Sequence, residues 1–339
     1  MALVTITAER LQSLYDRFNG KRIAVVGDLM LDRYLWGSVS RISPEAPVPV
    51  VEVDSESTRL GGAANVANNI ASLGGTPLMV GVIGSDDGGK VLKKIITEMG
   101  FPTTGIVTDP TRPTTTKTRL IAHHQHVVRI DQEVKTDIGP DILARILDVL
   151  KREVEKLDGI ILEDYNKGVV VKDLIREIVS LARSNGKIVT VDPKFNNFFE
   201  YKNVTVFKPN RSETEAALGC RLQDEGAAEA AASEMLKRLD AENVLLTLGE
   251  KGMILLEARG EVTHVPTHAR KVADVSGAGD TVISTLTMGL VAGATMKEAA
   301  TLANFAGGVV CGEVGIVPID KAGLYEAVLE QTNHQPDGH

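Results

Sequence analysis

The segment DVSGAGDTVISTLTMGLVAG, residues 274–293, joins a stretch of very small side chains to a long apolar run. Small residues and an aspartate just before an apolar run are typical of the start of a helix. Asp280 then has two interpretations. It can be an acidic residue that caps the helix or favours its dipole, or it can lie beside an anion that binds the free N–H groups of the first turn. The two are compatible, and this segment alone does not separate them.

The composition is that of an ordinary globular chain with an excess of acidic residues. The 339 residues are 43% hydrophobic and 24% charged, with a net charge of −8. This charge argues against nonspecific binding to nucleic acid or to an anionic membrane surface. The N-terminus lacks the features of a signal peptide, no apolar run reaches membrane-spanning length, and the two cysteines show no paired spacing. We therefore expect a cytoplasmic protein that binds neither nucleic acid nor membrane.

Short runs rich in valine and isoleucine alternate with helical patterns along the chain. The runs lie at residues 22–28, 78–84, 159–164, 187–192, 203–210 and 243–249, and helical patterns cover 139–157 and 171–186. Continuous apolar runs of this length are typical of parallel strands that are buried on both faces. Their alternation with helices predicts an α/β fold with a doubly wound, mainly parallel sheet.

Two segments, residues 32–60 and 113–133, do not belong to this series. Both alternate polar and apolar residues, as antiparallel strands with one exposed face do. We interpret them as a small β-sheet that stands off the main sheet as a lid, although an ordinary edge hairpin is the simpler alternative. No linker divides the chain, so we predict one domain over residues 1–331 and a disordered tail over 332–339.

Polar side chains follow five of the predicted strands at the point where each strand ends, at residues 28–32, 163–167, 192–194, 208–213 and 249–252. Because ligands bind beyond the carboxyl ends of the strands in an open parallel sheet, these residues predict a binding crevice on one rim. Its lysines suit a polyphosphate, and Asn210 with Glu213 suits a hydrated Mg²⁺. Asp280 beside a bound phosphate could accept the proton of an attacking hydroxyl group during phosphoryl transfer.

Three other kinds of site are not supported. The chain has no G-x-x-x-x-G-K-[ST] segment, so we expect no Walker loop. The GAGDTV segment lacks the third glycine of G-x-G-x-x-G, which argues against a dinucleotide site. His123, His124 and His126 could be taken for a metal cluster, but no cysteine or carboxylate set completes a ligand shell. We interpret the histidines as a polar surface of the lid.

Four motifs together resemble the ribokinase family, also called the PfkB carbohydrate kinases. DVSGAGDT resembles the family's D-[ST]-x-G-A-G-D signature, and GGAANVANNIASLG, residues 61–74, resembles its first signature. KPNRSE (208–213) carries the family's N-x-x-E, and TLGEKG (247–252) its T-x-G-x-x-G. The matches run in family order through nearly the whole chain, and Val275 departs from the threonine of many members. The resemblance implies a ribokinase-like fold and an ATP-dependent sugar kinase.

The resemblance also implies a role for each matching position. Asp280 would be the catalytic base, and Gly277, Ala278 and Gly279 would form an anion hole. ATP and its Mg²⁺ would be bound by Asn210, Glu213 (through water to the metal), Thr247, Gly249, Gly252 and Asn304. The sugar would be held by Asp28, Asp32, Gly61, Gly62 and Asn65. A monovalent cation such as K⁺, used by several relatives, would lie near Asp274.

A closer resemblance concerns residues 27–50 and 113–131, which are similar to family members that phosphorylate D-glycero-D-manno-heptose 7-phosphate at O1. The candidates for binding the phosphate of such a sugar are Lys117, Arg119, Arg129, Lys167 and Lys194. EDYNKG, residues 163–168, resembles the SDYxKG of these kinases, with Glu163 in place of serine. Many of them continue into a nucleotidyltransferase domain with an H-x-G-H motif. None is present here, so a stand-alone kinase is expected.

Other family members that act on a different sugar phosphate or on a nucleoside remain alternatives, as does a non-catalytic sensor of sugar and ATP. The family also pairs its lids. Apolar residues between positions 46 and 53 of the first lid segment, more than an isolated lid should expose, therefore predict a homodimer through the lid.

Overall fold

Nine strands form the main sheet in the computed structural model, which describes residues 5–122, 125–267, 273–313 and 315–334. The order is β13-β12-β11-β10-β9-β8-β1-β4-β5. The six runs rich in valine and isoleucine form its centre, and they lie parallel to one another. These strands are β1 (Arg22–Gly27), β4 (Thr76–Ile83), β8 (Gly159–Glu163), β9 (Ile188–Asp192), β10 (Val206–Phe207) and β11 (Asn243–Thr247). The predicted mainly parallel sheet is confirmed.

The edges of the sheet were not predicted. β12 (Met253–Glu257) and β13 (Val262–Val265) add antiparallel strands at one end, and β5 (Ile106–Thr108) adds a parallel one at the other. The apolar part of β12 is Met-Ile-Leu-Leu. Methionine and leucine favour helices at least as much as strands, so such a run carries little strand signal.

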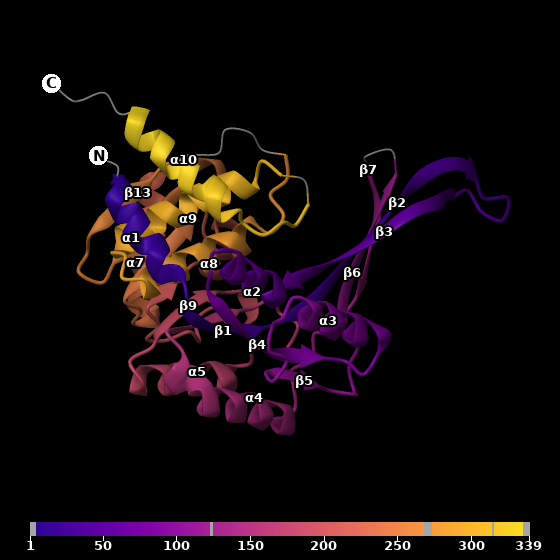
Figure 1. The fold of residues 1–339 in the computed structure, drawn as a ribbon, viewed down its shortest axis with the longest axis horizontal. Coiled ribbons are helices and arrows are strands. Elements are labelled where there is room, and N and C mark those ends of the chain that lie inside the picture. The colour runs from indigo at the N-terminus through magenta and orange to yellow at the C-terminus, as the bar shows by residue number, and fades with distance from the viewer. Residues whose placement is uncertain (1–4, 123–124, 268–272, 314, 335–339) are drawn as a thin grey trace.

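Helices cover both faces of the sheet (Figure 1). One hydrophobic cluster contains residues of α1 (Ala8–Phe18), α2 (Ala63–Ser72), α3 (Asp87–Glu98), α8 (Ala278–Val291), α9 (Met296–Val310) and α10 (Lys321–His334). The cluster on the other face contains residues of α4 (Pro140–Glu153), α5 (Lys172–Ser184) and α7 (Glu225–Leu239). The predicted helix over 171–186 therefore exists, and Asn185 is its C-cap. Within the described ranges, no helix is both long and apolar enough to span a lipid bilayer.

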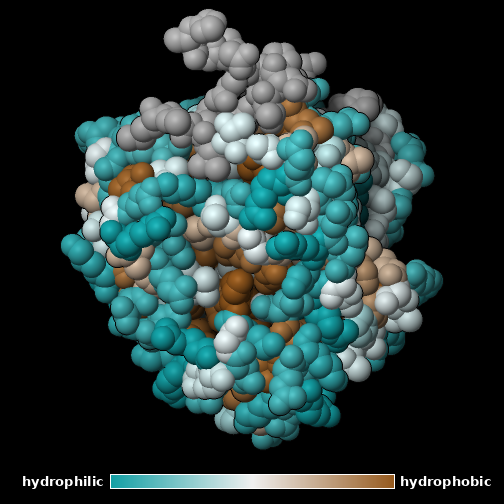
Figure 2. Space-filling view, turned by 60° about the vertical axis from the view of Figure 1, so that its left-hand side comes forward, coloured by the Kyte–Doolittle hydropathy of each residue, from teal (hydrophilic) through white to brown (hydrophobic). Residues whose placement is uncertain are grey.

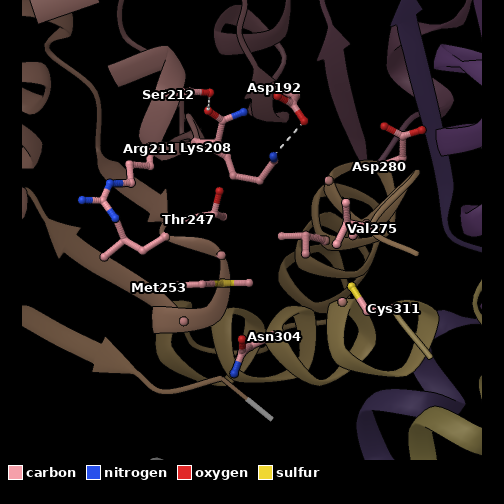
Figure 3. A pocket seen from close by; sticks show the side chains of 18 of the residues that line it. Asp192, Lys208, Arg211, Ser212, Thr247, Met253, Val275, Asp280, Asn304 and Cys311 are labelled. Atoms are coloured by element: carbon pink, nitrogen blue, oxygen red, sulfur yellow. Dashed lines mark hydrogen bonds and ion pairs between the residues drawn. The ribbon is translucent and has the colours of Figure 1, made fainter. Parts of the chain in front are cut away.

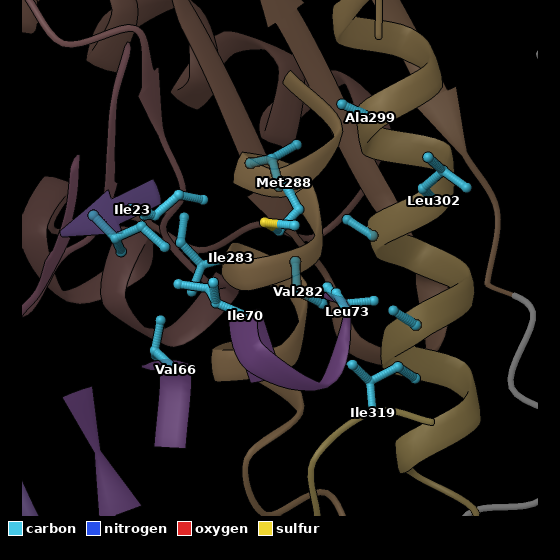
Figure 4. Packing of buried hydrophobic residues seen from close by; sticks show 14 of the residues in the cluster. Ile23, Val66, Ile70, Leu73, Val282, Ile283, Met288, Ala299, Leu302 and Ile319 are labelled. Atoms are coloured by element: carbon cyan, nitrogen blue, oxygen red, sulfur yellow. The ribbon is translucent and has the colours of Figure 1, made fainter. Parts of the chain in front are cut away.

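α8 is the central helix of the first cluster. All residues from 280 to 289 are buried. In Figure 4, Ile283 lies beside Ile23 of β1 and Ile70 of α2, and α9 lies on the other side of α8. Because it is covered on every side, the position of its first turn is fixed by packing. That turn lies within the DVSGAGDT segment, residues 274–281.

Four further strands form a separate sheet that projects from the body of the molecule (Figure 1). They are β2 (Leu29–Ile42), β3 (Pro49–Gly62), β6 (Thr115–Ala122) and β7 (Gln125–Gln132), in the order β3-β2-β6-β7. Each predicted segment is an antiparallel hairpin, but the two hairpins join through a parallel pair, β2 with β6. We call this sheet the lid.

The predicted tail is helical where it is described. α10 extends through His334, so residues 332–334 belong to a helix, and residues 335–339 lie outside the described part of the chain. His123 and His124, predicted as polar lid surface, also lie outside it. His126 lines a small pocket of about 40 Å³ together with lid residues and Asp274.

Candidate active site

The first turn of α8 holds Asp280 inside the helix. Gly277 is the N-cap, with φ of 79°, and no side chain makes a capping hydrogen bond at this end of the helix. Helical residues begin at Ala278, so Asp280 is the third residue of the helix. Its carboxylate does not cap the helix, which excludes capping but not the effect on the dipole. It favours the dipole by its position alone.

The Asp280 carboxylate is buried and receives hydrogen bonds from two distant segments. Asn65 Nδ2 donates to Oδ2 at 2.7 Å, and the Tyr165 hydroxyl donates to Oδ1 at 2.7 Å. Burial raises the pKa of Asp280 to about 6, although both hydrogen bonds act in the opposite direction. A carboxyl group with this pKa is ionised at neutral pH and still basic enough to accept a proton.

The glycine pair that precedes α2 allows the lid to approach this site closely. A Cβ atom on Gly61 would lie 2.0 Å from Oδ2 of Asp32, which side chains cannot tolerate. Gly62 has φ of 56°, a conformation that glycine adopts without strain. The turn at Gly62 starts α2, whose third residue is Asn65. The glycines therefore place the donor to Asp280 beside the base of the lid.

A cavity of about 870 Å³ opens in front of the start of α8 (Figure 3). In addition to Asp280, it brings together the predicted anion-hole residues and five predicted nucleotide-binding residues, namely Gly277, Ala278, Gly279, Asn210, Thr247, Gly249, Gly252 and Asn304. One face of the molecule is hollowed, with hydrophobic side chains inside a hydrophilic surround (Figure 2). An open cavity with an apolar wall and a polar end suits a nucleotide, whose base has apolar faces and whose phosphates are charged.

Several residues that line this cavity have no role assigned from the sequence. Lys208 and Tyr165 each follow a predicted strand and lie within quoted motifs, KPNRSE and EDYNKG, as does Arg211 in the first of them. Met253 and Cys311 also line the cavity, and no motif contains them. Figure 3 shows Lys208 reaching toward Asp192 across the polar end.

Two lysines and two carboxylates form a network at this end. Lys208 Nζ lies 2.7 Å from Asp192 Oδ2, and both side chains are buried. Lys194 Nζ lies 2.5 Å from Glu213 Oε1 and 3.4 Å from Asp192 Oδ1. Burial by itself would lower the pKa of Lys194, but the carboxylates of Asp192 and Glu213 outweigh burial and raise it, so this lysine stays charged. A Cβ atom on Gly279 would lie 3.8 Å from Lys208 Nζ, which places that ammonium group at the start of α8.

The oxygen atoms of Asp192 and Glu213 suit Mg²⁺. The ion prefers oxygen ligands and is commonly held by one or two carboxylates, phosphate oxygens and several waters. The described residues contain no group of three or more histidine, cysteine, aspartate or glutamate side chains that could hold a metal ion by themselves. The chemistry of this pair therefore fits a metal ion that arrives with a phosphate ligand.

Three predicted aspartates have partners that the motifs did not indicate. Asp28 is buried, and its carboxylate accepts backbone N–H groups of residues 165, 167 and 169, so it holds the loop that carries Tyr165. Asp32 is buried and forms an ion pair with the partly buried Arg119. Asp274 accepts the backbone N–H groups of Ser276 and Gly315. The assignments of Asp28 and Asp32 to the sugar, and of Asp274 to a monovalent cation, remain predictions.

Four of the five candidate cations for a sugar phosphate are already paired. Arg119 pairs with Asp32, Arg129 with Asp131 at 2.9 Å and Lys167 with Glu133 at 2.7 Å, and Lys194 lies in the network above. Within the described residues, the Lys117 ammonium group forms no ion pair or hydrogen bond. Burial lowers its pKa, and the nearby positive charge of Lys167 lowers it further.

Glu163, the last residue of β8, is an acid without a partner. Its side chain is fully buried, and neither carboxyl oxygen has a hydrogen-bond partner among the residues that the structure describes. Burial raises its pKa well above the ordinary value, and the charges of Asp192 and Asp280 raise it further. Burial and these two charges therefore favour the neutral form of Glu163.

Comparison with known proteins agrees with this geometry. The family described as "pfkB family carbohydrate kinase" matches residues 21–321. The bifunctional protein HldE of Geobacter sulfurreducens is 43% identical over 314 residues, which are 93% of this chain and 64% of that protein. HldE of Helicobacter pylori strain J99 is 43% identical over 315 residues, which are 92% of this chain and 67% of that protein. This chain thus spans about two thirds of the length of these relatives.

Solved structures share the ribokinase-like fold. Phosphofructokinase-2 from Escherichia coli, in complex with potassium, superposes with a TM-score of 0.74 at 18% identity, over 93% of this chain and 99% of that one. Arabidopsis thaliana ribokinase, complexed with ribose and ATP, superposes with a TM-score of 0.72 at 18% identity, over 91% of this chain and 99% of that one. At this identity the likeness concerns the fold alone.

We predict that Glu163→Gln stabilises the protein at neutral pH. The pKa of Glu163 is raised in the folded state, so the unfolded chain releases this proton at lower pH than the folded one. The resulting loss of stability is absent near pH 4 and grows as pH rises above the ordinary glutamate value. Glutamine is neutral at every pH, and no hydrogen bond is lost. The melting temperature of the variant should match that of the wild type near pH 4 and exceed it at pH 7.

Glu215→Gln is the control with the opposite sign. Glu215 accepts the backbone N–H of Leu222 and pairs with Arg221 and Arg211, and these contacts lower its pKa. Its contribution to stability is present at neutral pH and lost in acid, so this variant should melt below the wild type at pH 7 and approach it in acid. If Glu163→Gln instead melted below the wild type at pH 7 and matched it at pH 4, the raised pKa of Glu163 would be contradicted.

Proposed function

Because the chain belongs to the pfkB family of carbohydrate kinases, we propose that it transfers the terminal phosphoryl group of ATP to O1 of D-glycero-D-manno-heptose 7-phosphate. The product is the 1,7-bisphosphate, from which nucleotide-activated heptose for lipopolysaccharide or other surface glycans is made. The heptose assignment is supported by the resemblance of residues 27–50 and 113–131 to kinases of that sugar. The observation that carries the chemistry is the buried Asp280 carboxylate beside the cavity at the start of α8.

The residues around Asp280 suit a single in-line transfer. Asp280 accepts the proton of the O1 hydroxyl while O1 forms a bond to the γ-phosphorus. The bond from that phosphorus to the bridging oxygen breaks, and ADP leaves with the electron pair. Free N–H groups of the first turn of α8 and the Lys208 ammonium group stabilise the negative charge on the transferred group. Asn65 and Tyr165 keep the carboxylate oriented.

Asp192 and Glu213 are the residues that would hold Mg²⁺, the usual companion of ATP. When bound, the ion shields the charges of the phosphates. Glu213 is fixed for this role because its Oε2 accepts the backbone N–H of Asn210 at 2.8 Å in the capping box of α6 (Arg211–Leu218). The N-x-x-E motif therefore starts a helix and positions a carboxylate with the same residues.

Lys117 is the side chain best suited to the phosphate that the sugar already carries. It lies in register with Asp32 of β2 and Asp131 of β7, on the face of the lid that also carries Arg119. Asp131 and Asp32 attract the Lys117 charge without forming an ion pair with it, and a partly buried lysine without such a contact is costly. A phosphate group would supply that contact. Lys167 lies close enough to affect the Lys117 pKa, so it adds a second positive charge.

Two alternatives differ from this proposal in their substrates or in turnover. Another family member would act on a different sugar phosphate or on a nucleoside. A sensor would bind sugar and ATP without releasing ADP. Asp280 at a pKa of about 6 favours a catalyst over a sensor, since binding alone does not need a base.

The substrate test is a panel of acceptors in a coupled assay of ADP release. We expect D-glycero-D-manno-heptose 7-phosphate to be the best acceptor, ahead of unphosphorylated heptose, fructose 6-phosphate and ribose. Lys117→Met should lower kcat/KM for the 7-phosphate by roughly 10- to 100-fold, as loss of a charge-assisted hydrogen bond worth about 1.5–3 kcal/mol predicts. It should leave the low rate with unphosphorylated heptose unchanged.

Lys151→Met is the matched control, because Lys151 is an exposed lysine of α4. It should keep the full preference for the phosphorylated sugar. Equal rates with heptose and its 7-phosphate would exclude a phosphate-binding role for the lid, and a faster reaction with fructose 6-phosphate or ribose would favour another member of the family.

Asp280→Asn should lower kcat by about 10²–10⁴-fold, the usual contribution of a positioned general base. Asparagine keeps the size of the side chain, and the Tyr165 hydroxyl can accept from its amide as well as donate. ATP affinity and melting temperature should therefore change little. In the wild type, kcat/KM should fall about tenfold per pH unit below pH 6, because only the ionised carboxylate accepts a proton.

Asp87→Asn provides the comparison, because Asp87 is an exposed aspartate in the first turn of another helix, α3. It should keep wild-type turnover and the same fall in kcat/KM below pH 6. Wild-type turnover in Asp280→Asn would mean that Asp280 only favours the helix dipole.

We further propose that a second copy of the chain covers the lid. Its exposed apolar side chains are Ile42, Val48, Val53, Val127, Val128 and Ile130, which are between 39% and 61% exposed. Sedimentation equilibrium at micromolar concentration should give the mass of a dimer, and Ile130→Lys should shift it toward the monomer. Val91→Lys, at an exposed apolar position of α3, should not. A wild-type monomer would exclude this proposal.

A further inference from the structure

Lys194 lies between two carboxylates at the polar end of the cavity. It follows β9, and its ammonium group contacts Glu213 Oε1 at 2.5 Å and Asp192 Oδ1 at 3.4 Å. Nζ also lies 5.2 Å from the centre of the Tyr165 ring, whose hydroxyl group contacts Asp280. A single cation therefore bridges the two residues that suit Mg²⁺ and touches the residue that orients Asp280.

The two carboxylates are held in place by their other oxygens. Asp192 Oδ2 accepts from Lys208, and Glu213 Oε2 accepts from the backbone N–H of Asn210. The oxygens that remain, Asp192 Oδ1 and Glu213 Oε1, both face Lys194. This pair is preorganised for one cation, and such a position takes either an ammonium group or a metal ion, because two positive charges there would repel strongly.

We propose that Lys194 is a resident cation that competes with a divalent metal ion for Asp192 and Glu213 and gives way when the metal ion arrives with the nucleotide. The identity of the metal ion rests on the proposed function. Without nucleotide, the ammonium group neutralises the carboxylates and keeps the metal ion out. With nucleotide, the phosphates offer Lys194 a new anionic partner, so metal binding becomes coupled to nucleotide binding.

The two lysines of the network differ in their freedom to move. The Lys208 side chain is 3% exposed and contacts Asp192 from within the protein. The Lys194 side chain is 25% exposed and lines the cavity. Lysine carries its charge on a flexible four-carbon chain, so Lys194 can leave the carboxylates without a change in the backbone. Lys208 is the fixed member of the pair, and Lys194 is the exchangeable one.

The test measures Mn²⁺ binding to the whole chain in the absence of nucleotide, by the electron paramagnetic resonance signal of free Mn²⁺. Lys194→Met keeps the length of the side chain and removes the charge, so it should bind Mn²⁺ at least about tenfold more tightly than the wild type. Lys194→Arg keeps the charge and should bind as weakly as the wild type. Lys194→Met combined with Glu213→Gln should lose the added affinity, which would assign the gain to this carboxylate.

Lys172→Met is the control for loss of a lysine charge elsewhere, because Lys172 is an exposed residue paired with Glu200. It should not change Mn²⁺ affinity. Equal affinity in wild type and Lys194→Met would overturn the proposal, as would a gain that persists in the double variant. Should Lys194→Met fail to fold, Lys194→Gln gives the same comparison. The measurement uses neither sugar nor ATP, so its failure is distinct from a failure of the sugar assay.

Discussion

The hydrogen bonds that hold the Asp280 carboxylate are the interaction on which the site depends. A carboxylate loses most of its hydration when it is buried, and only donors in the correct place keep it ionisable near neutral pH. Here the donors come from Asn65 in α2 and from Tyr165 after β8. The base is therefore formed only when three segments that are far apart in the sequence meet at the carboxyl edge of the sheet. The burial of α8 fixes one of them, and the backbone bonds that Asp28 accepts fix another.

The charge of this region follows from the same burial. Four carboxyl groups, those of Glu163, Asp192, Glu213 and Asp280, lie near two ammonium groups, those of Lys194 and Lys208. With every group ionised, the region would be negative and would repel a nucleotide. Burial offsets this by raising the pKa of Glu163, which favours its neutral form, while the free N–H groups of α8 add partial positive charge. Both effects make an acidic site more compatible with an anionic ligand.

The sequence predicted the parts of this structure that local patterns determine. The six buried strands follow from valine and isoleucine, and the motifs that contain Asp280, Asn210 and Thr247 mark residues that meet at one cavity. What could not be predicted depends on register and on three-dimensional pairing. All five candidate cations carry the same charge in the sequence. Strand register places Lys117 opposite Asp32, yet Asp32 pairs with Arg119 two residues further along β6, so the pairing depends on a placement of side chains that no local pattern indicates. In the same way, no local pattern indicates that Asp28 binds a loop 137 residues away.

The lid uses the alternation of its strands for two purposes. Residues in register alternate between faces, so Asp32, Lys117 and Asp131 form a charged row on one face. The rows on the opposite face contain Leu35, Leu120 and Val128, and Arg33, Thr118 and Ile130. A four-stranded sheet that projects from the body has few contacts to order it, and its apolar face is costly in water. If a second copy covers that face, the contact also holds the charged face steady beside the cavity. Pairing of the lids and recognition of the sugar would then share one sheet, because strand geometry places the two sets of side chains on opposite sides of the same backbone.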